Sequence, residues 1–164
     1  LRERAATELE RLYRTGGKAV EDLMEKVLTL KGVPVVAQLQ FRELLAIASI
    51  AQGETFYDGD EIVRQGERGS SMYIITGGKV RIVSRAGGED VALATLAESD
   101  YFGEMALFDD SARSATAVAE GEVRVLRIDK REFRDMLREY PVVSIMMCEE
   151  FCRRLRRTIE KVTV

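Results

Sequence analysis

The residues best suited to chemistry lie in one short segment, residues 102–116, which reads FGEMALFDDSARSAT. Gly103 lets the backbone approach a ligand closely, and a helix that starts there would direct free N–H groups and the positive end of its dipole at an anion. Arg113 carries a fork of donors that fits phosphate oxygens, and Ser114 adds one more donor. Glu104 repels phosphate but accepts a hydrogen bond from a neutral neighbour such as a ribose hydroxyl. The segment therefore indicates a nucleotide site.

The elements that must position this segment have the pattern of an antiparallel β structure. From residue 53 onward, short runs of β-branched and aromatic residues alternate with glycines, which is typical of a sandwich or barrel. Gly77-Gly78 and Gly87-Gly88 predict tight hairpin turns. We expect a two-faced strand on which Val80, Ile82 and Ser84 alternate with Arg81 and Val83. The inner wall continues through Val91, Leu93 and Leu96, and a last strand contains Val123, Val125 and Ile128.

Helical patterns flank this β region on both sides. The first covers residues 1–14, where Leu1, Ala5, Leu9 and Leu12 have helical spacing. A second helix is expected over 18–31, with Val20, Leu23, Met24, Val27 and Leu28 on one face, and a third over 41–51, which buries Leu44, Leu45, Ile47 and Ala48. After Asp129 the period is helical again, through Phe133, Met136 and Leu137, and Pro141 starts a last helix. The prediction is one β-roll flanked by helices.

Three blocks of the sequence carry a family resemblance. The 102–116 segment resembles the phosphate-binding cassette of cyclic nucleotide-binding domains, and residues 57–67 and 72–80 resemble the entry strands and the next hairpin of that family. The family includes catabolite activator proteins, protein kinase A regulatory subunits and cyclic nucleotide-gated channels. The resemblance spans roughly residues 34–161. It implies an α+β, mainly β fold: an antiparallel, jelly-roll-like β-roll flanked by N-terminal helices and a C-terminal lid helix. Residues 1–33 would be a helical segment, as at the tail of an upstream module, and 34–164 the binding domain.

The same resemblance implies roles for individual residues. Glu104 would accept the ribose 2′-hydroxyl, Arg113 would pair with the cyclic phosphate, and Ser114 would touch phosphate or base. The remaining residues of the implied site are Gly103 and Ala106 through their amides, Ile82, Leu93, Leu96 and Met105 as apolar walls, and Thr158 as a purine contact on the lid. Simpler interpretations stay open: Glu104 could complement a helix N-terminus, Arg113 could pair with Asp109 or Asp110, and the strand residues could be plain core.

Composition narrows the classes of function. The 164 residues have a net charge of −3, which gives no electrostatic footprint for nucleic acid, and contain no histidine, which removes the usual triads, most zinc chemistry and a metal-dependent jelly-roll enzyme. No apolar run has the roughly 20 residues of a membrane helix. The chain opens with Leu1, which favours a domain from a longer protein. We expect a cytoplasmic, non-catalytic domain, with a membrane-attached parent as an alternative.

The last helix has a pattern of its own. Ile145, Cys148, Cys152, Leu155, Ile159 and Val162 recur at 3-4-3-4-3 spacing, which is a heptad seam. The seam packs either on the chain's own domain or on a second copy in a homodimer. The two cysteines are expected as small apolar residues of a packed face, with a redox or metal pair as the alternative. The basic run Arg153, Arg154, Arg156, Arg157 and Lys161 is expected as a solvated helix end, or as a contact to the base or a neighbouring domain.

The function expected from these features is cyclic nucleotide sensing. The expected ligand is cAMP. The resemblance leaves cGMP as the alternative, because cGMP-preferring members of the family hold guanine with a hydroxyl next to the arginine, the position of Ser114 here; no cofactor is expected. The partners are the cyclic nucleotide, an attached effector domain and a second copy of the chain, without nucleic acid contact from this chain. Closure of the C-terminal helix would shift a population of states and transmit binding to the effector. A scaffold of the same fold that binds no ligand is the remaining alternative.

Overall fold

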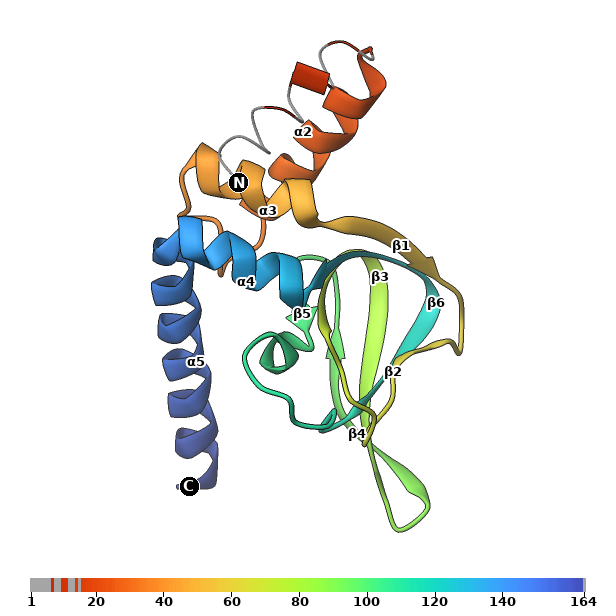
Figure 1. Cartoon of the computed structure of the whole chain (residues 1–164). Helices are drawn as coiled ribbons and strands as arrows, with labels where there is room; N and C mark the ends of the chain where they lie inside the picture. The colour runs from red at the N-terminus through yellow and green to blue at the C-terminus, as the bar shows by residue number, and fades with distance from the viewer. Residues whose placement is uncertain (1–6, 8–9, 12–13, 15, 164) are drawn as a thin grey trace. The chain divides into compact units, whose positions relative to one another are not determined.

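The structure, a computed structural model, describes residues 7, 10, 11, 14 and 16–163 (Figure 1). Its helices are α2 (Lys18–Lys31), α3 (Phe41–Ile50), the 3-10 helix η1 (Glu104–Leu107), α4 (Lys130–Glu139) and α5 (Pro141–Val162). Its strands are β1 (Gln52–Phe56), β2 (Glu61–Val63), β3 (Ser71–Ala86), β4 (Glu89–Leu96), β5 (Tyr101–Phe102) and β6 (Thr116–Asp129). The apolar residues of the helix expected over 1–14 lie outside the described residues. Two compact units form, Ile50–Arg134 and Leu1–Ser49 with Asp135–Val164; the expected division into 1–33 and 34–164 stays a prediction.

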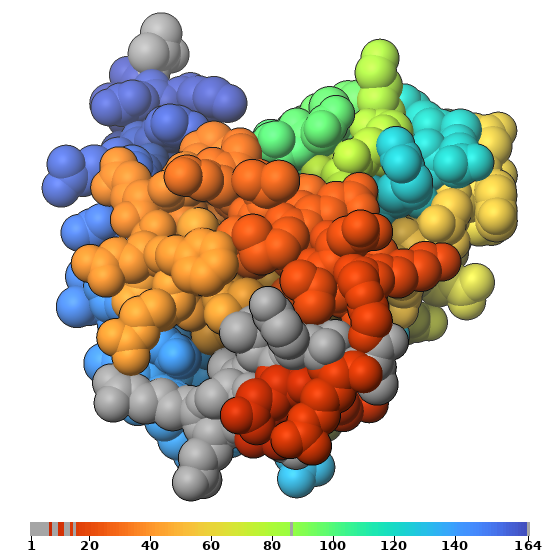
Figure 2. Space-filling view, turned by 90° about the horizontal axis from the view of Figure 1, so that it is seen from above, coloured from red at the N-terminus to blue at the C-terminus, as the bar shows by residue number. Residues whose placement is uncertain are grey.

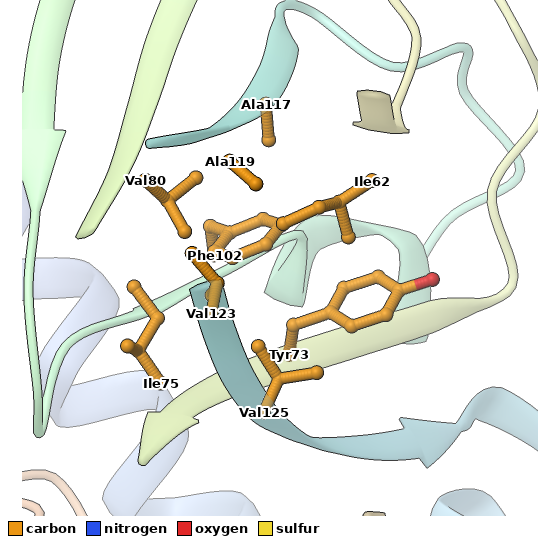
Figure 3. Close-up of a cluster of buried hydrophobic side chains, with 9 residues drawn as sticks. All are labelled: Ile62, Tyr73, Ile75, Val80, Phe102, Ala117, Ala119, Val123 and Val125. Atoms are coloured by element: carbon orange, nitrogen blue, oxygen red, sulfur yellow. The ribbon is translucent and has the colours of Figure 1, made fainter. Parts of the chain in front are cut away.

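The Ile50–Arg134 unit is an antiparallel β-roll, as the sequence predicts. The sheet runs β1-β6-β3-β4, while β2 pairs with β6 and β5 pairs with β3. Its strands enclose a core of buried side chains that point toward one another in Figure 3. The members of this core are Ile62, Tyr73, Ile75, Val80, Phe102, Ala117, Ala119, Val123 and Val125. Tyr73 and Phe102 stack with their ring centroids 5.2 Å apart, which fixes β5, and the segment that follows it, against β3.

The two glycine pairs behave differently. Gly87-Gly88 joins β3 to β4 with φ of 71° and 89°, the left-handed conformations that a two-residue hairpin turn requires, so this prediction is confirmed. The hairpin predicted at Gly77-Gly78 is wrong, because β3 continues through both residues with register shifts against β6 on either side of Gly77. Gly78 has φ of 87°, and a Cβ there would overlap the carbonyl oxygen of Glu122. The pair therefore forms a bulge that bends a long strand.

The predicted inner wall is right for the central strands and wrong for the outer hairpin. Val80, Val123, Val125 and Ile128 are at most 1% exposed, and Ile82 and Leu96 pack partly buried against the core. Val91 and Leu93 are instead 53% and 57% exposed. The reason is that β4 pairs with β3 alone and lies at the edge of the sheet. A register shift between Ile82 and Val83 also turns Val83 inward, where it is fully buried.

The helical unit contains α2 and α3, which form one continuous surface in Figure 2. Helix α2 has the predicted bounds, but its buried residues are Leu23, Val27 and Leu30, while Met24 and Leu28 are exposed. Three of the four residues predicted as buried in α3 are buried, namely Leu44, Ile47 and Ala48; Leu45 is half-buried.

Helix α5 is one uninterrupted element in Figure 1 and starts at Pro141 as predicted. Val143 and Met147 form its buried face. The heptad seam lies on another face, where Ile145, Leu155, Ile159 and Val162 are between 55% and 81% exposed and both cysteines are exposed. Both cysteines therefore lie on an exposed face of α5 and not on the expected packed one, while packing of the seam on its own domain or on a second copy stays a prediction. Among the described residues, no helix is both long enough and apolar enough to cross a membrane.

Candidate functional site

One pocket brings together most of the residues that the sequence singles out. Its volume is about 140 Å³, and its lining is Gly103, Glu104, Met105, Ala106, Asp109, Ser111, Ala112, Arg113 and Ser114. All of these residues come from the connection between β5 and β6, which contains η1. The lining residues thus carry a carboxylate, backbone amides, a guanidinium and a hydroxyl, which is the set of groups that a sugar phosphate needs.

The pocket begins at a glycine that no other residue can replace without strain. Gly103 has φ of 78°, and a Cβ there would lie 2.6 Å from Nη1 of Arg113 and 3.1 Å from the carbonyl oxygen of Ser71. Helix η1 follows directly. It has only 4 residues, so the dipole of a longer helix, which the sequence suggests, does not form here. Glu104 and Ala106 are buried, while Met105 is 59% exposed.

Arg113 is held by backbone carbonyls. Its Nη2 donates to the carbonyl oxygen of Ser71 at 2.7 Å, and its Nη1 donates to that of Gly103 at 3.2 Å. Asp110 pairs with Lys130, and Asp109 accepts from the amide of Ser111, so the interpretation of Arg113 as a partner of either aspartate is wrong. Burial lowers the pKa of the guanidinium from its usual value, against the opposing effect of the nearby Tyr73 and Glu104. A desolvated cation held by neutral carbonyls favours an anion as its ligand.

The segment that follows β2 supports Arg113, and no prediction from the sequence covers this support. A Cβ on Gly69 would overlap the guanidinium, so the side chain lies across a glycine. The backbone N–H of Arg113 donates to the carbonyl of Glu67, and the N–H of Gly66 donates to the carbonyl of Arg113, both at 2.8 Å. Arg113 also lines a second pocket, of about 210 Å³, whose walls include Gly69, Ser71 and Tyr73. The signal in the sequence was the spacing of Gly66 and Gly69 directly before a strand.

Two cations of α4 bind the C-terminal end of η1 and the residues that follow it. We call these two residues, Lys130 and Arg134, the cation clamp. Lys130 donates to the carbonyl oxygen of Asp109 and to the carboxylate of Asp110, each at 2.6 Å. Arg134 donates to the carbonyl oxygens of Leu107 and Phe108, each at 3.1 Å. The last carbonyl groups of a helix lack partners inside it, and Arg134 supplies partners to Leu107 and to the cap residue Phe108. These hydrogen bonds join residues 107–110, beside the pocket, to α4.

The apolar contact beneath the clamp strengthens the same link. The rings of Phe108 and Phe133 meet edge to face with centroids 5.9 Å apart. Phe133 itself is 2% exposed. Hydrogen bonds and ring packing thus both join the segment around η1 to the first turns of α4.

The remaining residues implied by the resemblance lie elsewhere. Ile82 and Leu96 pack against the core of the β-roll, and Leu93 is exposed on the outer hairpin. Thr158 belongs to the helical unit, where its hydroxyl donates to the carbonyl oxygen of Arg154 at 3.0 Å. None of these four lines the pocket around Arg113. Within the described part of the chain, no group of three or more acidic, cysteine or histidine side chains is arranged to hold a metal ion.

Comparison with known proteins identifies the family. The profile of the cyclic nucleotide-binding domain matches residues 54–140, which include every strand from β2 to β6 together with η1. The chain belongs to this family.

Relatives occur in bacteria and in eukaryotes. The cyclic AMP receptor protein of Thermus thermophilus is 33% identical over 77% of this chain and 59% of its own length. Human cGMP-dependent protein kinase 2 is 33% identical over 80% of this chain and 18% of its own length. Among solved structures, the regulatory domain of Toxoplasma gondii protein kinase A with cAMP superposes with a TM-score of 0.74 at 26% identity, over 82% of this chain and 51% of that one. The chain thus spans less than two thirds of the length of each of these relatives.

Proposed function

We propose that this chain is a cAMP-binding sensor domain that regulates an attached effector without catalysing a reaction itself. The observation that carries the proposal is the environment of Arg113: a half-buried guanidinium, held by two carbonyls, on the wall of a pocket shared with Glu104. Two of its five N–H donors are used in these bonds, which leaves donors for a bidentate contact to a phosphate. The cyclic phosphate would supply the counter-charge, and Glu104 would accept the ribose hydroxyl.

The identity of the base, adenine or guanine, is the more specific part of the proposal. Relatives named for cAMP and a relative named for cGMP both match the chain, so the family alone does not choose between them. Ser114 lines the pocket beside Arg113, where its hydroxyl is available to a guanine as well as to a phosphate oxygen. We take cAMP as the ligand and cGMP as the second candidate.

Transmission would start at the cation clamp. A ligand that pulls η1 toward Arg113 also pulls the carbonyls that Lys130 and Arg134 hold. Helix α4 would then move, and α5, which begins two residues after α4 ends, would move with it. Binding would shift the population of two states in proportion to the difference in ligand affinity between them.

The second copy of the chain is the proposed partner of α5. The exposed seam has apolar or small side chains at every a and d position from Ile145 to Val162. Arg153 and Arg154 are each paired with Glu150 on the same helix, which reduces repulsion between two such helices. A two-fold dimer would pair the seam with itself.

Thermal unfolding with cAMP, cGMP and 5′-AMP tests the function. A ligand at 100 times its dissociation constant stabilises the folded chain by about 2.7 kcal/mol. We expect the midpoint to rise with cAMP, to rise less with cGMP, and to stay unchanged with 5′-AMP, whose dianionic open phosphate does not match one guanidinium and a few amides. A midpoint unmoved by both cyclic nucleotides would favour the scaffold function instead.

A further inference from the structure

The exposed seam of α5 carries two thiols. Cys148 and Cys152 are both exposed and line one open groove together with Ile145 and Arg156. With Ile145 as position a of the heptad, Cys148 is a d residue and Cys152 the next a residue. The cysteines thus occupy two consecutive layers of the surface through which we propose that two chains associate.

A disulfide within one chain does not fit the helix. Side chains four residues apart on a helix have Cβ atoms about 5–6 Å apart. A disulfide needs Cβ atoms about 3.5–4.5 Å apart. Cys148 and Cys152 lie inside the continuous helix α5, so they cannot bond to each other without unwinding it. Their partners for oxidation must come from another molecule.

A parallel, in-register pair of α5 helices supplies those partners. Around a two-fold axis, each a and d residue lies opposite its own counterpart, so Cys148 faces Cys148 and Cys152 faces Cys152. The flanking pairs in this register are Ser144 with Glu149, Phe151 with Arg156, and Thr158 with Thr163. None of them brings like charges together. In an antiparallel pair centred between Cys152 and Leu155, both cysteines would face leucine or isoleucine instead.

We propose that this seam is a thiol switch, in which peroxide links two chains through the same cysteine of each copy; the inference rests on the dimer proposed above. Hydrogen peroxide oxidises one thiolate to a sulfenic acid and releases one water. The facing thiol attacks that sulfur, the S–S bond forms, and the hydroxyl leaves with a proton as a second water. A dithiol reductant reverses the link. Oxidation thus converts a dimer that dissociates on dilution into one that does not.

The test combines sedimentation with non-reducing electrophoresis. With reductant, we expect sedimentation to show a non-covalent dimer. With peroxide, we expect non-reducing electrophoresis to show a covalent dimer, and a reductant should cleave its disulfide. Cys148→Ser and Cys152→Ser each still cross-link through the remaining thiol, and the double variant does not. Leu155→Lys, which keeps both thiols and disrupts the seam, serves as the control and should lose the cross-link.

The outcomes separate this inference from the dimer on which it rests. A reduced chain that sediments as a monomer overturns both. A reduced dimer that peroxide fails to cross-link overturns the thiol switch alone. Peptide mapping that finds Cys148 joined to Cys152, or equal cross-linking in Leu155→Lys, also overturns it, because the in-register pairing would then be wrong.

Discussion

Arg113 lies against two glycines, Gly69 and Gly103, that leave no space for side chains of their own. We expect Gly69→Ala to weaken cAMP binding by about 10-fold, equivalent to about 1.4 kcal/mol, because the new methyl group displaces the guanidinium from the carbonyl of Ser71. Calorimetric titration measures the change. Gly53→Ala is the matched control, since a Cβ there meets nothing within 4 Å. An unchanged affinity in Gly69→Ala would show that this position of Arg113 is not the binding one.

A substitution of Glu104 tests the contact to the ribose hydroxyl separately from the contact to the phosphate. Glu104→Gln keeps the size of the buried side chain but replaces a charged acceptor by a neutral one, which lowers a hydrogen bond from roughly 1.5–3 to about 0.5–1.5 kcal/mol. We expect cAMP to bind about 10-fold more weakly, while 2′-deoxy-cAMP binds both proteins alike. Equal losses for the two ligands in a double-mutant cycle would place the ribose hydroxyl elsewhere.

At the scale of elements, the ion pair between the cation clamp and Asp110 predicts how the stability of the fold depends on pH. The Lys130 ammonium, mainly through its hydrogen bond, holds the pKa of the Asp110 carboxyl below its usual value; Arg134 and Arg68 add to this. A carboxyl with a lowered pKa stabilises the fold while it is charged. Its contribution is therefore complete above its ordinary pKa and is lost as the pH falls through the lowered value.

The clamp is tested by the titration of one carboxyl. In Lys130→Met, we expect the NMR titration midpoint of Asp110 to move up toward the ordinary carboxyl range, though not fully, because Arg134 and Arg68 remain. Lys79→Met, on β3, should leave the midpoint where it is. If Asp110 titrates identically with and without Lys130, η1 is not tied to α4 in this way.

The elements differ in how well the sequence predicts them, and the reason is physical. The bounds of α2 and the start of α5 follow from local signals, helical periodicity and a proline. Gly77-Gly78 has the local signal of a turn, yet pairing with β6 over a long distance in sequence keeps β3 intact. Leu93 fits the alternating pattern of a strand that faces a core, yet its side chain is exposed. Strand β4 lies at the edge of the sheet, so the alternating pattern alone does not predict burial there.

At the scale of the whole molecule, the exposed seam of α5 leads us to predict how a substitution in it changes dimerisation. We expect Leu155→Lys to sediment as a monomer at concentrations at which the unchanged chain is a dimer, because two ammonium groups would face each other in one layer of the seam. Leu28→Lys is the control, since Leu28 is 67% exposed on α2 and lies outside the seam. Equal association states of Leu155→Lys and the unchanged chain would exclude dimerisation through α5.

In the candidate site too, the sequence predicts contacts between neighbouring residues but not contacts between residues that are far apart in the chain. Residues near one another in the chain, from Gly103 to Ser114, line one pocket, and their roles in binding stay predictions. Ser71 is 42 residues distant in sequence from Arg113, and Gly69 is farther still, so only the fold brings these supports to the guanidinium. Thr158 belongs to a separate compact unit, and its role as a purine contact stays a prediction.

The central claim is that Arg113 binds the phosphate of a cyclic nucleotide. Calorimetric titration of cAMP into the unchanged chain, Arg113→Ala and Ser114→Ala tests it most directly, with thermal unfolding of each protein to show that it is folded. Two charge-assisted hydrogen bonds, at roughly 1.5–3 kcal/mol each, predict a loss of about 100-fold or more for Arg113→Ala. One neutral bond predicts a loss of about 10-fold at most for Ser114→Ala. A folded Arg113→Ala that binds cAMP as well as the unchanged chain does would contradict the account.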